Sequence, residues 1–506
     1  MVYLVAIVSF GAGFQTSILS SALGLPSFIT YFGLEETGPN ASHGTSLIGA
    51  LNGVYFAAAS ITAVSMHFLI DRIGRKLGIQ VCCIVFIVGG AIQAGSVAFG
   101  MLVAGRILSG FGYGMAMIAV PTYQAELSPA AIRGRMVGAH GALLILGFCI
   151  ANWVGYGCYF AEGNAQWRIG MSLQVVGHLT ALVLSPLLPE SPRWLIFNDK
   201  AVEGLEVLKR LHSRSTDLDH LVAREEFLQI KEQLALEKSS SSALTDIFRL
   251  PSYRKRLYCG CLVQFAAIST GILVLVNYQI SLYNQLGLNG STPVLLLAVY
   301  NTWAFIVNYG GTFLVDYVGR VKQMKIGFIG AICCVCCLTA LLAEYSGTNN
   351  RVGNGFGVLF LFLYEFFYGG FIDAISFIYV AEIFPSGIRA LGVGISLSAY
   401  FLATLIYTQV APTATSHIGW RYFLVFITVP AACLVVMWFL LPETKGLTLE
   451  EIAAAFGDNV AVDLNHMDSE RRKALDETIL GGGGLSESPR SNTPRSILEN
   501  EVEKVT

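Results

Sequence analysis

Apolar residues fill most of this chain in long stretches that short polar segments separate. A helix of about 20 mostly apolar residues crosses the hydrocarbon core of a bilayer. The first stretch has no basic leader and is interrupted by Gly11, Gly13 and Gln15, so we interpret it as a spanning helix and not a signal peptide. Helices are predicted near 3–25, 47–70, 77–98, 100–122, 136–157, 169–188, 257–283, 293–315, 325–345, 355–381, 391–412 and 420–441. The pattern therefore predicts an all-α membrane protein with twelve transmembrane helices.

Composition strengthens this prediction. Of 506 residues, 54% are hydrophobic and only 13% are charged, whereas soluble domains carry about 25% charge. Single soluble cores stop growing beyond about 250–300 residues, so much of this apolar surface is expected to face lipid. The net charge of −2 includes no basic patch, and no nucleic-acid partner is expected.

Two polar segments divide the chain. One lies between the sixth and seventh predicted helices, and the other follows the twelfth. We predict a six-helix bundle over 1–190, a linker with short helices over 191–256, a second six-helix bundle over 257–442 and a tail over 443–506. Gly481–Gly484 and the Ser488-Pro489 and Thr493-Pro494 pairs predict a disordered tail, either phosphorylated or a plain spacer.

Loop charges predict the orientation in the membrane. Positive residues favour cytoplasmic loops. The loops after helices 2, 4, 8 and 10 carry Arg72, Arg75, Lys76, Arg133, Arg135, Arg320, Lys322, Lys325 and Arg389. The opposite loops carry only Arg168, Arg351 and Arg421. Both termini are therefore expected in the cytoplasm, and Asn40, in an Asn-Ala-Ser triplet, becomes an extracellular glycosylation candidate.

The chain repeats itself at a spacing of about 250 residues. Four segments recur in the same order: 71–75 as 316–320, 126–133 as 382–389, 167–168 as 420–421, and 189–191 as 442–444. Two similar bundles related by an axis along the membrane normal form one architecture of secondary transporters, with the solute held between them at the midplane. The repeat therefore predicts two related halves and alternating access.

Charged residues in and beside these repeats lie at predicted cytoplasmic helix ends. Exposed ion pairs contribute about 0–1 kcal/mol each, but several together can bias two nearly balanced states. We interpret them as a cytoplasmic latch that is closed when the cavity faces outward, the alternative being topology signals only. The set comprises Asp71, Arg72, Arg75, Glu126, Arg133, Glu190, Arg193, Asp316, Arg320, Glu382, Arg389 and Glu443.

Neither metal nor enzyme chemistry is predicted. All eleven cysteines lie in apolar segments, without the polar CxxC pairs or neighbouring histidines of zinc sites, and are expected to pack between helices. Walker loops, dinucleotide fingerprints and nucleophile elbows are missing in any usable context. No cofactor is expected.

The repeated segments resemble the sugar porter family of the major facilitator superfamily, and fungal members above all. The resemblance extends over residues 1 to about 455 and implies the major facilitator fold. It rests on Asp-Arg-Ile-Gly-Arg-Lys at 71–76, Gly105-Arg106, Pro-Thr-Tyr-Gln-Ala-Glu at 121–126, Arg-Gly-Arg at 133–135, Pro-Glu-Ser-Pro-Arg-Trp-Leu at 189–195, 316–320 and Pro-Glu-Thr-Lys-Gly at 442–446. It also implies a monomer in the plasma membrane.

The solute site departs from the family pattern that the resemblance implies. Gln15 takes the place of the aspartate of proton-coupled members, which leaves Arg106 without its usual acid. Family amides fall at Gly141, Ala267, Ile268, Leu273 and Ala304. By position, the expected solute-binding residues are Gln15, Asn277, Tyr278, Asp373, Phe377, Tyr400 and Phe401, with Arg106 and Asp373 as coupling candidates.

These departures leave the cargo open. A sugar hydroxyl desolvated without a partner costs roughly 1–3 kcal/mol, so sugar sites need amides. The main hypothesis is a carrier of a sugar or sugar-like solute, either by facilitated diffusion or by proton symport. In helix 10, Glu365 and Asp373 are expected near one face, and Asp373 is either a proton site, a solute ligand or a structural carboxylate. The alternatives are a carrier of a less polar metabolite and a nutrient sensor that signals through its tail.

Overall fold

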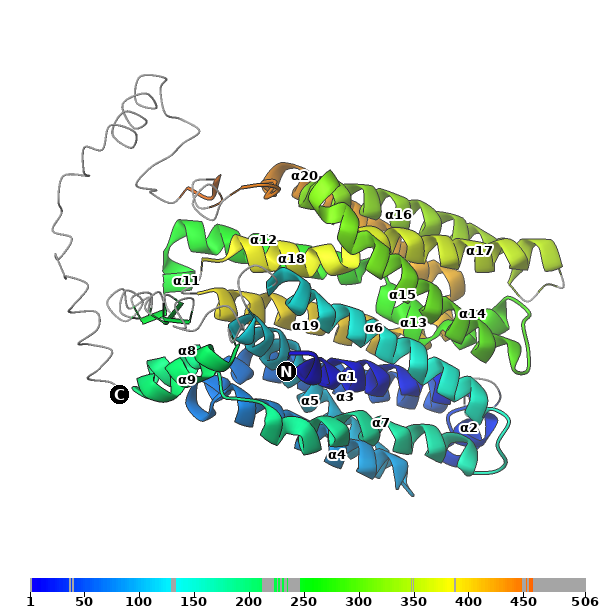
Figure 1. The fold of residues 1–506 in the computed structure, drawn as a ribbon. Helices are drawn as coiled ribbons and strands as arrows, with labels where there is room; N and C mark the ends of the chain where they lie inside the picture. The colour runs from blue at the N-terminus through cyan, green and yellow to red at the C-terminus, as the bar shows by residue number, and fades with distance from the viewer. Residues whose placement is uncertain are drawn as a thin grey trace, which may run out of the picture. The chain divides into compact units, whose positions relative to one another are not determined.

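The structure is a computed structural model in which every regular element is a helix, among the residues that it describes (Figure 1). Those residues are 2–35, 38, 41–128, 133–211, 223–224, 226–227, 230–231, 234, 246–346, 348, 350–385, 388–447, 452 and 455–457. Asn40 lies outside them, as does most of the predicted tail. The glycosylation and sensor hypotheses therefore remain predictions.

In its described residues, the N-terminal half has six long helices and one short helix. They are α1 (Val2–Ala22), α2 (Pro26–Phe32), α3 (Ala41–Ile73), α4 (Arg75–Ala94), α5 (Phe99–Leu127), α6 (Arg133–Cys158) and α7 (Ala165–Leu184). Helix α1 packs against α5, α6 and α7, while α3 packs against α5. The short α2 was not predicted. It begins at Pro26, and Phe28 and Phe32 pack their rings on Trp167 at 5.7 and 5.4 Å.

The C-terminal half repeats this plan with interrupted helices. It comprises α12 (Pro251–Ser269), α13 (Ile272–Asn277), α14 (Gln279–Gln285), α15 (Thr292–Val318), α16 (Arg320–Tyr345), α17 (Arg351–Tyr368), η3 (Gly369–Asp373), α18 (Ala374–Ile383), α19 (Arg389–Ile418), η4 (Gly419–Leu424) and α20 (Val425–Leu440). Eleven segments of the described chain are long and apolar enough to span a membrane. The last, Leu391–Leu440, contains both α19 and α20, so the prediction of twelve helices in two bundles is confirmed.

Both halves belong to one compact unit, made of Met1–Ser191 and Ser242–Gly446. A second unit comprises Pro192–Ser241 and Leu447–Thr506. In it, α8 (Pro192–Phe197) and α9 (Ala201–Leu211) bury Ile196, Leu205 and Leu208 together. The short helix α11 (Asp246–Arg249) belongs to the first unit.

The prediction of one continuous helix over 257–283 is wrong. Helix α12 ends at Ser269, and Gly271 adopts a φ of 93° before α13 begins. That left-handed conformation favours glycine. A Cβ at this position would also lie 2.7 Å from the ring of Phe426. The break thus lies against a neighbour from α20, and Asn277 and Tyr278 follow it in the chain.

The helix predicted over 355–381 contains one π-helical turn. Helix α17 passes through Gly369–Asp373 into α18. Such turns are rare and frequent at functional sites. A Cβ on Gly311 of α15 would lie 2.3 Å from the carbonyl oxygen of Gly370, so the two backbones meet here at close range. The π turn ends on Asp373.

The cysteine prediction is only partly right. All eleven cysteines are free, and Cys82, Cys83, Cys149, Cys158, Cys259, Cys334 and Cys433 are buried. However, Cys333, Cys336 and Cys337 are exposed on α16, a spanning segment. Their side chains face outward because lipid accepts small apolar groups as readily as a protein interior does.

Candidate functional site

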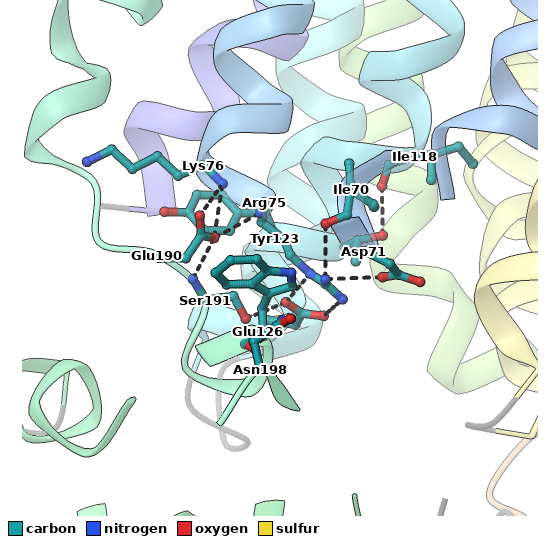
Figure 2. Close-up of polar contacts among 12 residues, drawn as sticks. Ile70, Asp71, Arg75, Lys76, Ile118, Tyr123, Glu126, Glu190, Ser191 and Asn198 are labelled. Carbon is teal, nitrogen blue, oxygen red and sulfur yellow. Dashed lines mark hydrogen bonds and ion pairs between the residues drawn. The ribbon is translucent and has the colours of Figure 1, made fainter. Parts of the chain in front are cut away.

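An arginine–carboxylate cluster joins three helix ends of the N-terminal half (Figure 2). Arg75, the first residue of α4, donates through Nε and Nη2 to the two carboxylate oxygens of Glu126, at 2.9 and 3.0 Å. Its Nη1 lies 3.1 Å from Asp71 Oδ1. Ser191 Oγ donates to the same carboxylate of Glu126 at 2.5 Å. Fork-to-fork pairs of this kind are among the strongest polar contacts in proteins.

Glu190 completes this cluster by capping α4. Its carboxylate accepts hydrogen bonds from the backbone N–H groups of Arg75 and Lys76, at 2.8 and 3.1 Å (Figure 2). The first N–H groups of a helix have no partner within the helix, and the dipole there favours negative charge. Tyr123 also holds this segment by donating to the carbonyl of Pro189. The cap therefore ties the chain after α7 to the start of α4.

The C-terminal half contains the same cluster. Arg320, the first residue of α16, donates through Nε and Nη2 to Glu382 Oε1, at 3.2 and 2.9 Å. Glu443 accepts from the backbone N–H groups of Arg320 and Val321 at 2.8 and 3.1 Å, and so caps α16. Thr444 Oγ1 donates to Glu382 at 2.7 Å, as Ser191 does to Glu126.

These clusters contain seven of the twelve predicted latch residues. Asp71, Arg75, Glu126 and Glu190 form the first, and Arg320, Glu382 and Glu443 form the second. Arg72 is exposed, and Arg389 donates to the carbonyl of Phe384 at 3.0 Å. Arg193 belongs to the second unit, while the side chains of Arg133 and Asp316 lie outside the described set. Each ion pair found in the described residues joins helices of one half.

A chain of hydrogen bonds crosses between the halves; we call it the Arg106 relay. Buried Arg106 on α5 donates to Asn52 Oδ1 on α3 at 3.4 Å. Asn52 Nδ2 donates to the hydroxyl of Tyr278 at 3.0 Å, and that hydroxyl donates to the carbonyl of Thr408 on α19 at 2.7 Å. The relay therefore runs from a buried cation of one half to the backbone of the other.

Arg106 has no carboxylate among its described contacts. It donates to the carbonyl of Leu51 at 3.3 Å, and its guanidinium lies 4.1 Å from the ring centroid of Tyr55. Its Nη1 has no hydrogen-bond partner among the described residues. Gln15, predicted to take the place of the family aspartate, donates to Ser109 Oγ at 2.6 Å inside the N-terminal half. An aromatic ring and neutral oxygens surround this cation.

Two amides, one on α12 before the break at Gly271 and one at the end of α13 after it, have unused hydrogen-bonding capacity. Asn277 Oδ1 accepts from Ser20 of α1 at 3.0 Å, but its Nδ2 has no partner among the described residues. Gln264, on α12, is fully buried, and neither atom of its amide has a partner in that part of the chain. Buried amides usually have hydrogen-bond partners, so these atoms are free to bond to water or to a ligand.

Four aromatic rings gather between α5, α18 and α19. Phe377 and Tyr400 have ring centroids 5.9 Å apart, and Tyr400 and Phe401 have theirs 5.4 Å apart. Phe401 in turn meets Tyr113, of the other half, at 5.6 Å. The structure thus brings together three of the four predicted aromatic residues, and Tyr113 joins them, while Tyr278 belongs to the Arg106 relay.

The tenth predicted helix corresponds to α17, η3 and α18, and we keep the name helix 10 for it. Its two acids, Glu365 and Asp373, both contact α15, so the prediction that they share one face is confirmed. Asp373 Oδ2 accepts from Asn308 Nδ2 at 2.5 Å. Glu365 Oε2 accepts from the hydroxyl of Tyr300 at 2.7 Å. Glu365 is buried and Asp373 only half-buried. Ionisable groups inside the membrane are costly and mark functional sites.

Sequence reasoning missed Asn52, Tyr113, Gln264, Tyr300 and Thr408. Each lies in an apolar stretch, and its polar side chain was the one feature of the sequence that could have identified it. Periodicity alone could not select them, because helices that are apolar on every side have no distinct polar face.

Comparison with known proteins shows that this chain is similar to membrane transporters. A family model described as "Sugar (and other) transporter" matches residues 1–456. The MFS-type transporter criB of Aspergillus cristatus is 30% identical over 470 residues, which cover 92% of this chain and 95% of that protein. A high-affinity glucose transporter of Kluyveromyces lactis is 27% identical, with 88% and 83% covered.

Two further likenesses extend over both halves. Myo-inositol transporter 2 of Cryptococcus neoformans var. grubii is 29% identical over 506 residues, with 95% of this chain and 87% of that protein covered. The structure of the proton:xylose symporter XylE bound to 6-bromo-6-deoxy-D-glucose superposes with a TM-score of 0.75 at 21% identity, covering 90% and 98% of the two chains. At this identity the superposition shows a shared fold.

Proposed function

Because this chain belongs to the sugar transporter family of multi-pass membrane carriers, we propose that its solute is a sugar or sugar-like polyol that moves between the halves by alternating access. The single observation that carries the proposal is the pair of amides with unpaired atoms, Gln264 on α12 and Asn277 on α13. Amides donate and accept at once, as hydroxyl-rich solutes require.

This chain lacks several amides of the family pattern, and other amides take their role. Gln264, Asn277, Asn301 and Asn308 are buried between the helices of the C-terminal half. Asn277 bonds to Ser20 of the other half, so a solute bound there would touch both halves. Relatives named as glucose and myo-inositol transporters are consistent with a polyhydroxyl solute.

Alternating access requires that contacts between the halves break while each half keeps its shape. The Arg75–Glu126–Glu190 and Arg320–Glu382–Glu443 clusters each lie within one half, so we assign them the second task. The Arg106 relay crosses between the halves and must open for the solute to pass. In this form, the predicted latch acts by keeping the helix ends of each half together.

Asp373 is the proposed coupling residue. Gln15 cannot exchange a proton, whereas a half-buried carboxylate held by Asn308 can. If Asp373 takes up a proton together with the solute, a proton gradient drives accumulation. If it remains a structural carboxylate, transport is facilitated diffusion.

The test is transport by purified protein in proteoliposomes, across a panel of hexoses, pentoses, polyols and less polar metabolites, with and without a pH gradient. We expect saturable uptake of a sugar or polyol that the inward proton gradient increases. Asp373→Asn should abolish the effect of the gradient and still permit solute exchange at equal pH. Glu365→Gln, which changes the other acid of the same helix, should keep the dependence on the gradient.

Two results would contradict this proposal. Absence of flux for every carbohydrate, in protein that is folded and monodisperse, would exclude a sugar-like solute. Flux that ignores both the gradient and Asp373→Asn would exclude coupling through that acid.

A less polar metabolite is the second candidate. The rings of Tyr113, Phe377, Tyr400 and Phe401 offer a continuous aromatic surface at the same place. Uptake of an apolar panel member that carbohydrates do not inhibit would favour this candidate over a sugar.

We further propose that the carrier is a monomer in the plasma membrane with both termini in the cytoplasm. The loop charges support this orientation, since the loops after the second, fourth, eighth and tenth predicted helices carry most of the lysine and arginine. Labelling of the loops at Asp71 and Asp316 from opposite sides of the membrane would contradict it.

A further inference from the structure

An apolar groove runs along α16 and α17, on helices that span the membrane. Its volume is about 460 Å³, within the ~300–1,000 Å³ typical of small-molecule sites. Ile326, Ile329 and Leu363 along it are exposed. The full lining comprises Ile326, Ile329, Gly330, Cys333, Cys334, Cys337, Phe360, Leu363 and Phe367. None of these lining residues belongs to the candidate solute site.

Small side chains on one face of α16 create this groove. Gly330, Cys333 and Cys337 take the place of the large apolar residues that usually cover a lipid-facing helix. Phe367 of α17 occupies the space beside Gly330, where a Cβ would lie 2.2 Å from its ring. The two exposed cysteines therefore have a structural consequence: they leave room for a chain-like apolar ligand.

Positive charge lies at one end of the same face. Lys322 precedes Ile326, Ile329, Cys333 and Cys337 at helical spacings of four, seven, eleven and fifteen residues, so all five share one side of α16. Lys322 is exposed, and Lys325 Nζ lies 4.3 Å from the ring centroid of Trp438, as in residues that anchor helices at a membrane surface. From Lys322 to Cys337 the helix rises about 22 Å, enough to run from one surface past the middle of a ~30 Å hydrocarbon core.

The related helix of the other half provides an internal comparison. Helix α4 starts at Arg75 as α16 starts at Arg320, and counting from these arginines aligns their faces. On α4 this register places Leu77 where α16 has Lys322, Val85 where it has Gly330, and Val88 where it has Cys333. The charge and the small residues thus occur together on α16 and are both missing at the matching positions of α4.

We propose that this groove binds an anionic phospholipid, with its headgroup at Lys322 and Lys325 and one acyl chain along Ile329, Cys333 and Cys337, beside the Phe367 ring. The acyl chain fits the apolar lining, and the phosphate meets the lysines at the depth where a membrane surface lies. Anionic lipids attract basic residues close to the surface, which also selects this ligand over a neutral one. The site would make the activity of the carrier depend on the lipid composition of its membrane.

The experiment uses the full chain in phosphatidylcholine nanodiscs, with a phosphatidylserine probe that carries a photoreactive diazirine in its acyl chain. Mass spectrometry of the digested protein locates the adducts. We expect labelling on α16 and α17 residues of the groove, reduced by unlabelled phosphatidylserine and not by phosphatidylcholine. Both leaflets of a nanodisc have one composition, so the result does not depend on the proposed orientation or on the identity of the solute.

Three variants test the two parts of the site. Lys322→Gln, an exposed change, should weaken labelling about five-fold, the effect of one lysine near an anionic surface. Cys333→Phe should fill the groove and remove its adducts. Val88→Phe, at the matching exposed position of α4, should leave them unchanged. Equal thermal melting of the three variants would show that each remains folded.

Several outcomes would overturn the proposal. Equal labelling by the matched phosphatidylcholine probe would exclude headgroup selection. Equal labelling of the α4 face around Val88 would show ordinary annular lipid only. Competition by a sterol, without competition by phosphatidylserine, would assign the groove to another ligand.

Discussion

At the scale of single residues, two glycines permit carboxylates to cap helices. Gly74 and Gly319 have φ angles of 94° and 101°, each directly before the helix that is capped. A Cβ on Gly74 would lie 2.5 Å from Glu190 Oε2, and one on Gly319 would lie 3.1 Å from Glu443 Oε2. Glycine is needed there both for the backbone conformation and for the space that the carboxylate occupies.

Gly74→Ala should therefore destabilise the protein more than Gly33→Ala does. Both substitutions place alanine at a positive φ: Gly33 is in the left-handed helical region, which costs alanine roughly 1–2 kcal/mol, and Gly74, with a ψ of 163°, is in an extended region that is essentially restricted to glycine. Only Gly74→Ala also displaces a carboxylate, because a Cβ on Gly33 has no other atom within 4 Å among those described. The measurement is the apparent melting temperature in detergent, and equal losses in the two variants would refute a role for the cap.

At the scale of elements, α15 and helix 10 act as a matched pair. Tyr300 and Asn308 on α15 meet Glu365 and Asp373 on helix 10, and the two pairs have the same spacing along each chain. The helices can approach this closely because Gly311 lies against Gly370 in the π turn. The position of Asp373 thus depends on contact between two helix backbones.

Gly311→Ala should separate these helices and break the contact between Asn308 and Asp373. We expect loss of gradient-driven uptake in a protein that still inserts and remains monodisperse. Gly310→Ala is the control, since its Cβ would meet none of the described atoms within 4 Å. Transport in proteoliposomes with a pH gradient measures both, and unchanged coupling in Gly311→Ala would separate the π turn from transport.

At the scale of the whole molecule, movement requires that the two halves separate at the Arg106 relay. Asn52, Tyr278 and Thr408 connect α3, the junction of α13 with α14, and α19 through a single hydroxyl group. A hydrogen bond of this kind contributes about 0.5–1.5 kcal/mol net, so two of them can change a nearly balanced equilibrium several-fold. Ser60 and Ser398 form a second contact between α3 and α19, at 2.8 Å.

Tyr278→Phe should shift the equilibrium toward the state in which this contact is open. Tyr283→Phe removes a hydroxyl whose described partner, Gln279, lies in the same helix, and so serves as the control. Hydrogen–deuterium exchange of the α13 amides should become several-fold faster in Tyr278→Phe alone. Equal exchange in both variants would mean that the relay does not hold the halves together.

The sequence by itself determined the membrane class, the twelve helices, the two related halves and the carboxylates and arginines of the two clusters. These features can be recognised without knowing which helices are neighbours. A run of apolar residues long enough to cross a bilayer is visible in the sequence, and the internal repeat pairs each charged residue of the clusters with its counterpart.

Only the tertiary structure decided the break at Gly271, the π turn, the partners of Arg106 and the exposure of Cys333. The first two depend on atoms from other helices, namely the Phe426 ring and the Gly311 backbone. The side of a helix that faces lipid is as apolar as the side that faces protein, so hydrophobic periodicity cannot distinguish them. In a membrane protein, the position of a polar side chain relative to the other half is set by packing, and only coordinates show it.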